Sequence, residues 1–155
     1  MKQISFFAIA LAVAVFSSSC SKDDDKDTTK PVIELHEPAD GDTLFIGYET
    51  HLEMDLSDNV KLKSYKVDIH NNFDGHGHTK SATTDVAWTF TKSWDVSGLK
   101  NTHIHHHEIE VPTTINGSPI AKGNYHFMLY CTDEAGNESY VVKNVVVGVG
   151  IPHEE

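Results

Sequence analysis

Histidines are concentrated in two short stretches of this 155-residue chain. The stretch NTHIHHHEIEVP places four of the 11 histidines within five positions, at His103, His105, His106 and His107. A second group lies upstream and consists of His70, His76 and His78. Imidazole is a common ligand of transition metals, so both groups are candidate metal ligands.

The spacing of these histidines favours chelation. The pattern His-x-His occurs three times, at 76–78, 103–105 and 105–107. Residues i and i+2 of a strand lie on one face, about 6.6 Å apart. Two imidazoles at this spacing can lean onto one ion about 2.1 Å from each nitrogen. In the first copy, Gly75 and Gly77 allow the backbone to curl, and Asp74 adds an oxygen ligand.

We expect two sites at opposite ends of the domain. In the first, His70 and His126 project outward from neighbouring strands beside the loop that carries Asp74, His76 and His78. The second consists of His103, His105 and His107, with His106 or Glu108 in support. One shared site stays open as an alternative, because the intervening loop is long enough to fold back along the sheet.

Nitrogen and carboxylate donors favour zinc or copper(II), with copper(II) first at equal availability. The opposing interpretation is that exposed histidines only solvate an acidic surface. Calcium is a weaker candidate, because carboxylates in turns commonly cap the local backbone and no EF-hand spacing occurs. The turn carboxylates concerned are Asp40, Asp42, Asp58 and Asp133.

The N-terminus has the pattern of a lipoprotein signal. Residues 1–19 contain Lys2, an apolar run and small residues, which indicate a secretory signal peptide that is too short to span a membrane. The sequence SSSC is a loose lipoprotein box, so we expect cleavage before Cys20 and lipidation of its thiol. The alternative is an ordinary signal peptide in which Cys20 has no role.

Residues 20–30 read as an acidic, disordered tether, since they contain no apolar residue after Cys20. The Ser-Lys-Asp-Asp-Asp run resembles the signal that sends Bacteroidetes lipoproteins to the outer face of the outer membrane. Loss of Lys2 with the signal leaves 11 basic against 23 acidic residues, a net charge of −12. Nucleic acid is therefore excluded as a partner, whereas cations are favoured.

Residues 31–150 predict one all-β domain, followed by a short tail at 151–155. Short runs of alternating polar and apolar residues, separated by turn residues, indicate about seven strands. Such a pattern is typical of an immunoglobulin-like antiparallel β-sandwich. Trp88 is expected in its core, and Tyr125 is placed where such folds have a tyrosine corner.

Three local predictions depend on this pattern. Val86 to Phe90 are expected to begin a strand. Around the histidine run, Ile104 and Ile109 have opposite parity, so a regular strand is expected only from about His107, after a kink or an exposed edge extension. Cys131 has no disulfide partner and lies at an inward position, which favours a buried thiol over a soft metal ligand.

Two segments resemble strands of bacterial Ig-like domains, namely DLSDNVKLKSYKVDI and KGNYHFMLYCTDEAGNES. Together with the signal, lipid cysteine, acidic tether and histidine-rich loops, they make the chain similar to a family of small Bacteroidetes lipoproteins. This family is known only as a domain of unknown function, number four thousand six hundred and twenty-five. The resemblance extends from about Pro31 to Val149 and implies a fold but no activity.

The sequence therefore predicts a surface-exposed, lipid-anchored outer-membrane protein that binds zinc or copper(II). The alternative is a non-catalytic adhesion or accessory module of an outer-membrane transport or glycan-binding system, with an outer-membrane protein as its partner. Catalysis is not expected, since the sequence contains no Gly-x-Ser-x-Gly, His-Glu-x-x-His or phosphate-binding loop.

Overall fold

The computed structural model describes residues 26–73 and 85–152, and these form an all-β structure with no helix. Seven of the ten strands have six or more residues, which confirms the prediction of about seven strands in an antiparallel sandwich. No helix in the described part of the chain is long and apolar enough to cross a membrane. The strands are β1 (Val32–Glu37), β2 (Thr43–Phe45), β3 (Glu49–Ser57), β4 (Leu62–Asn71), β5 (Phe90–Asp95), β6 (Asn101–Glu110), β7 (Thr114–Ile115), β8 (Ser118–Pro119), β9 (Gly123–Asp133) and β10 (Glu138–Gly148).

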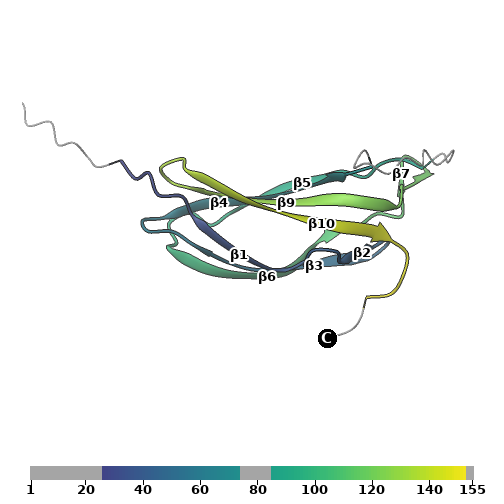
Figure 1. Ribbon diagram of the computed structural model, residues 1–155, viewed down its shortest axis with the longest axis horizontal. Coiled ribbons are helices and arrows are strands. Elements are labelled where there is room, and N and C mark those ends of the chain that lie inside the picture. Colours follow the sequence, from purple (N-terminus) through teal and green to yellow (C-terminus); the bar gives the residue numbers. More distant parts are fainter. Residues whose placement is uncertain (1–25, 74–84, 153–155) are drawn as a thin grey trace, which may run out of the picture.

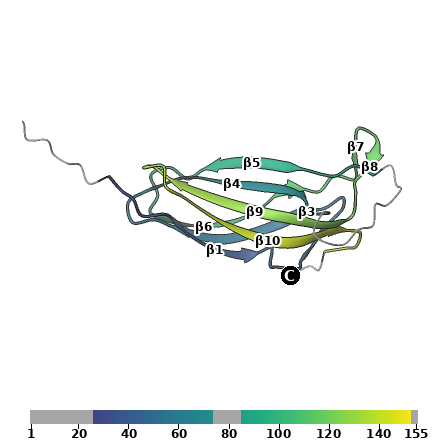
Figure 2. The same cartoon turned by 45° about the horizontal axis from the view of Figure 1, so that its top comes forward.

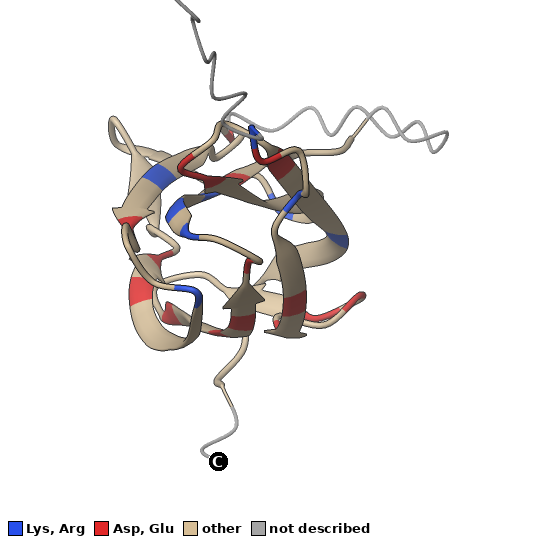
Figure 3. Ribbon diagram, turned by 90° about the vertical axis from the view of Figure 1, so that its left-hand side faces the viewer, with Lys and Arg blue, Asp and Glu red and all other residues tan. Residues whose placement is uncertain are grey.

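Two sheets pack face to face (Figures 1 and 2). The first has the strand order β1-β3-β6, and the second has the order β2-β10-β9-β4-β5. Neighbouring strands are antiparallel apart from β2, which runs parallel to β10. A view along the long axis shows acidic residues around the whole sandwich (Figure 3). The immunoglobulin type of the sandwich stays a prediction.

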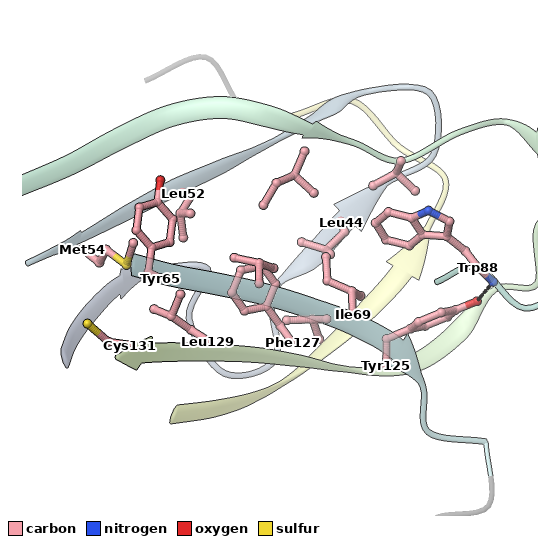
Figure 4. Close-up of a cluster of buried hydrophobic side chains, with 14 of the residues drawn as sticks. Leu44, Leu52, Met54, Tyr65, Ile69, Trp88, Tyr125, Phe127, Leu129 and Cys131 are labelled. Carbon is pink, nitrogen blue, oxygen red and sulfur yellow. Dashed lines mark hydrogen bonds between the residues drawn. The ribbon is translucent and has the colours of Figure 1, made fainter. Parts of the chain in front are cut away.

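Alternation along the strands builds the core between the sheets. In β3, Leu52, Met54 and Leu56 are buried, while the residues between them are partly exposed. This pattern follows from the period of two in a strand, which sends successive side chains to opposite faces. The largest buried side chains include Tyr125 and Phe127 of β9 (Figure 4). The three-stranded sheet therefore has a dry inner face and a polar outer face.

Tyr125 links the start of β9 to the segment before it. Its hydroxyl donates to the carbonyl of Ala121 at 2.8 Å. The same hydroxyl accepts from the backbone N–H of Trp88 at 3.2 Å (Figure 4). Tyr125 and Trp88 are both buried, at 0% and 4% exposure, as the sequence predicts. The bond to a carbonyl four residues upstream is of the tyrosine-corner kind.

The strand predicted from Val86 begins later than expected. Val86 makes only an isolated bridge to Ile120, and the regular strand β5 starts at Phe90. The prediction was wrong for residues 86–89, because the backbone N–H of Trp88 bonds to the Tyr125 hydroxyl instead of to a neighbouring strand. The alternation of apolar residues cannot distinguish a regular strand from an extended segment whose N–H groups bond to side chains.

The histidine run is regular where the sequence predicted a kink. Strand β6 starts at Asn101, well before His107, and pairs with β3 along its length. The register shifts between His106 and Ile109, which oppose Leu52 and Thr50. Such a bulge reverses which residues of β6, odd-numbered or even-numbered, point inward. It allows Ile104 and Ile109 to point inward despite their opposite parity, so the predicted position of the break was wrong.

Cys131 is a buried free thiol, as predicted. Burial, with added repulsion from nearby carboxylates including Asp58 and Asp133, raises its pKa to about 12. Metal binding requires a thiolate, which this environment strongly disfavours at neutral pH. Cys131 therefore belongs to the core (Figure 4).

Candidate metal centre

The outer face of the three-stranded sheet carries histidines and carboxylates in adjacent rows. On β3 and β6, Glu53 lies opposite His105, and Asp55 lies opposite His103. On the other side of β3, Asp55 lies opposite Glu34 of β1. Paired residues in antiparallel strands project to the same face, so the register itself gathers metal-binding groups on this surface.

Three imidazoles converge at one end of this face. One ligand nitrogen from each of His51, His105 and His107 lies within 4.8 Å of the other two. The ring centroid of His51 is 4.7 Å from that of His105 and 4.8 Å from that of His107. The rings of His105 and His107 are 5.8 Å apart. The predicted pair His105 and His107 thus lies beside a third histidine from β3.

His51 was not among the predicted ligands. Its outward parity in HLEMDLS was visible in the sequence, but its partner strand was not. His51 lies opposite the irregular part of β6, where the register between β3 and β6 shifts. Among the residues that the structure describes, its buried Nε2 has no hydrogen-bond partner, and a carboxylate oxygen of Glu53 lies 3.9 Å away. A buried polar atom without a partner is unfavourable, so a ligand at this nitrogen would stabilise it.

The three imidazoles can reach one ion after small side-chain rotations. Nitrogens on a tetrahedral zinc lie about 3.4 Å apart. Each pair of ligand nitrogens must therefore approach by no more than about 1.4 Å from its present separation. His105 and His107 are exposed, and their side chains have room to turn. Three protein nitrogens leave a fourth position open, and the three histidines line an open depression together with Phe45, Tyr48 and Pro152.

His103 lies further along the face and contacts carboxylates. Its Nδ1 is 3.1 Å from Asp55, and its Nε2 is 3.7 Å from Glu53. Asp55 also bonds to Nε2 of His36 at 2.8 Å. This hydrogen bond raises the pKa of His36, and the bonds from His36 and His103 lower the pKa of Asp55. His36, Glu34 and Asp55 form a second group whose ligand atoms lie within 4.8 Å of one another.

His106 points to the opposite face. Its Nε2 lies 3.0 Å from the Tyr65 hydroxyl, and its Nδ1 accepts from the backbone N–H of Glu108 at 3.3 Å. Since Nδ1 is an acceptor, Nε2 carries the proton and donates to Tyr65. Burial lowers the pKa of His106, which keeps the ring neutral. Both nitrogens are occupied, so His106 does not join the other three histidines.

Glu108 is held away from the cluster by β5. Its carboxylate accepts from Nζ of Lys92 at 2.5 Å and from Nε1 of Trp94 at 2.8 Å. These hydrogen bonds lower the pKa of Glu108. Its role in the structure is therefore to link the edges of the two sheets.

The other predicted group lies on the outer face of the five-stranded sheet. His70 and His126 are direct partners on β4 and β9, with ring centroids 5.5 Å apart. Asp68 bonds to Nδ1 of His70 at 2.7 Å, which leaves Nε2 of that ring free to bind a ligand. Asp74, His76 and His78 lie outside the described residues. The structure therefore places His70 and His126 together, on a different sheet from His51, His105 and His107. His51 near the start of β3 and His70 near the end of β4 lie toward the same end of the sandwich, because the turn 58–61 joins the other ends of these strands. The expectation of two sites at opposite ends was therefore wrong.

Comparison with known families gives one match. The profile of the family described as "Domain of unknown function (DUF4625)" matches residues 18–148. The chain belongs to this family. The match includes all ten strands of the described residues and confirms the predicted membership of this family alone. No curated protein matches the chain. The family description assigns no activity, so function must be argued from the site.

Proposed function

We propose that this DUF4625 protein is a lipid-anchored protein of the outer membrane that binds zinc or copper(II) through His51, His105 and His107. The observation that carries the proposal is the convergence of three imidazole ligand atoms within 4.8 Å of one another. Three neutral nitrogen donors suit zinc or copper(II) better than a hard cation such as calcium.

The environment of the three histidines supports reversible metal binding. His51 is fixed in the paired strand β3, whereas His105 and His107 are exposed on the edge strand β6. His51 would position the ion, and the solvent-exposed ligands would allow it to enter and leave. Acidic residues on the same face, among them Glu53 and Asp55, attract cations to the site. Such a site is suited to metal capture or delivery.

Calorimetric titration of untagged protein with zinc and copper(II) tests the proposal. We expect one ion bound with micromolar or tighter affinity at about pH 7.5, and weaker binding in acid because protons compete for imidazole. Changing His51, His105 or His107 singly to Ala should weaken binding at least about tenfold, since each removes one of three protein ligands.

His126→Ala is the matched control, because it removes a partly buried histidine from the other sheet. Binding should be unchanged in this variant. The proposal fails if the unaltered protein gives no binding heat, or if the His126→Ala variant loses as much affinity as the His107→Ala variant.

A further inference from the structure

Three carboxylates meet at the end of the sandwich where the N-terminal segment joins it. One ligand oxygen from each of Asp27, Asp58 and Asp133 lies within 4.8 Å of the other two. They come from the segment before β1, the β3–β4 turn and the end of β9. Figure 1 shows these segments together at one end of the molecule. Their separation matches one calcium ion, whose oxygen ligands lie at about 2.4 Å and so at most about 4.8 Å apart.

Burial makes this cluster different from an ordinary acidic surface. Asp133 is 0% exposed, although aspartate is almost never fully buried without a compensating partner. Oδ1 of Asp58 is also buried from solvent, and it has no hydrogen-bond partner in the described part of the chain. Among the described residues, none of the three carboxylates forms an ion pair. A bound cation would stabilise buried negative charge of this kind.

The local hydrogen bonds hold the carboxylates in place. Oδ2 of Asp58 accepts from the backbone N–H groups of Val60 and Lys61, so Oδ1 is the oxygen left for a ligand. Asn137 donates to both oxygens of Asp133, and its side chain also donates to the carbonyl of Asp27. The site is therefore assembled from rigid turns, and it includes the segment that precedes β1.

We propose that Asp27, Asp58 and Asp133 bind a calcium ion that fastens the N-terminal segment to the sandwich. Carboxylate oxygens without nitrogen donors favour a hard cation, and calcium accepts irregular sets of six to eight oxygens more readily than magnesium does. The calcium site is separate from the histidine cluster and does not depend on it. Part of the expected disordered tether thus becomes a fixed arm whose order depends on calcium.

Calorimetric titration with calcium chloride, in untagged protein that retains all described residues, tests this site. We expect one ion with a dissociation constant of about 0.1–1 mM, the range of extracellular modules. Asp27→Asn and Asp58→Asn should each weaken binding roughly tenfold or more, because each removes a charged ligand. Asn at position 58 can still accept the turn hydrogen bonds. Asp27 precedes the first strand, so its variant tests the site even if Asp58→Asn impairs folding.

Asp40→Asn is the matched control. Asp40 also lies in a turn and accepts hydrogen bonds from Asn144, but it is outside the cluster. Its variant should bind calcium like the unaltered protein. Hydrogen exchange at residues 27–31 should slow on adding calcium, and this slowing should be lost in Asp27→Asn. Absence of binding at about 10 mM calcium, or equal affinity in the Asp27→Asn and unaltered proteins, would overturn the proposal.

Discussion

At the scale of residues, hydrogen bonding separates the histidines into different roles. His106 uses both ring nitrogens within the protein. His36 is bound to a carboxylate, whereas Nε2 of His51 is buried and has no partner within residues 26–73 and 85–152. An imidazole binds a metal only through a nitrogen with a free lone pair. The candidate ligands are therefore distinguished by their neighbours and not by their spacing alone.

The His36–Asp55 pair predicts a pH-dependent contribution to stability. Because the pKa of His36 is raised above its ordinary 6.5, its contribution is fully present below that pH and is lost as pH rises through the folded value. The pKa of Asp55 is lowered from 3.8, so its contribution is present above that pH and is lost in stronger acid. The pair is therefore most stabilising between pH 3.8 and 6.5.

Thermal unfolding of the His36→Gln variant measures this effect. The difference in melting temperature from the unaltered protein should be larger near about pH 5.5 than near about pH 8.5. This difference in melting temperature should be small at both pH values, because the pair is exposed to solvent. An equal difference at the two pH values would show that the charge on His36 has no part in stability.

Sequence spacing could identify His105 and His107 because both lie on one strand and share its parity. It could not identify His51, since the third ligand depends on the register between β3 and β6. The 43 residues 58–100 separate these two strands in the chain. Register is set by the packing of the whole sheet and has no local signal. The same limit applies to Asp27, which reaches Asp58 and Asp133 only through the fold.

At the scale of elements, the bulge in β6 allows one strand to serve two purposes. Before the bulge, His103 and His105 point outward while Ile104 packs on the core. After it, Ile109 is fully buried. A bulge re-aims side chains while most of the ladder stays paired. The parity conflict in the sequence indicated such a break, but its position required the observed pairing.

The connection before β9 depends on Tyr125. Tyr125→Phe removes the hydroxyl that bonds to Ala121 and Trp88, and it leaves buried backbone groups without partners. We expect the free energy of unfolding, measured by urea denaturation, to fall by about 1–3 kcal/mol.

Tyr130→Phe provides the comparison for this variant. Among the described residues, the Tyr130 hydroxyl forms a hydrogen bond only to the sulfur of Met128, at 3.5 Å. The change in unfolding free energy should stay within about 0.5 kcal/mol. Equal effects of the two substitutions would contradict a special role for Tyr125.

At the scale of the whole molecule, the N-terminal segment that would carry the anchor joins the sandwich away from the histidine cluster. The N-terminal segment joins the sandwich at the end that holds Asp27, Asp58 and Asp133 (Figure 1). The histidine cluster lies on the outer face of the three-stranded sheet, nearer the other ends of β3 and β6. A lipid at Cys20 would then hold the protein at the membrane while leaving this face accessible.

Detergent partition tests the anchor. In a bacterial host, the unaltered protein should enter the detergent phase of Triton X-114, because acyl chains bury many CH₂ groups. Cys20→Ala should move it to the aqueous phase, and Cys131→Ala, which changes a buried thiol, should not. Equal partition of the unaltered and Cys20→Ala proteins would remove the lipid anchor from the proposal.

The most direct test of the central claim is an anomalous difference map from crystals of the untagged protein grown with zinc. The proposal predicts a zinc peak bonded to ring nitrogens of His51, His105 and His107, at about 2.0–2.1 Å from each. A map with no peak among these three rings, or with zinc bound only by other residues, would contradict it.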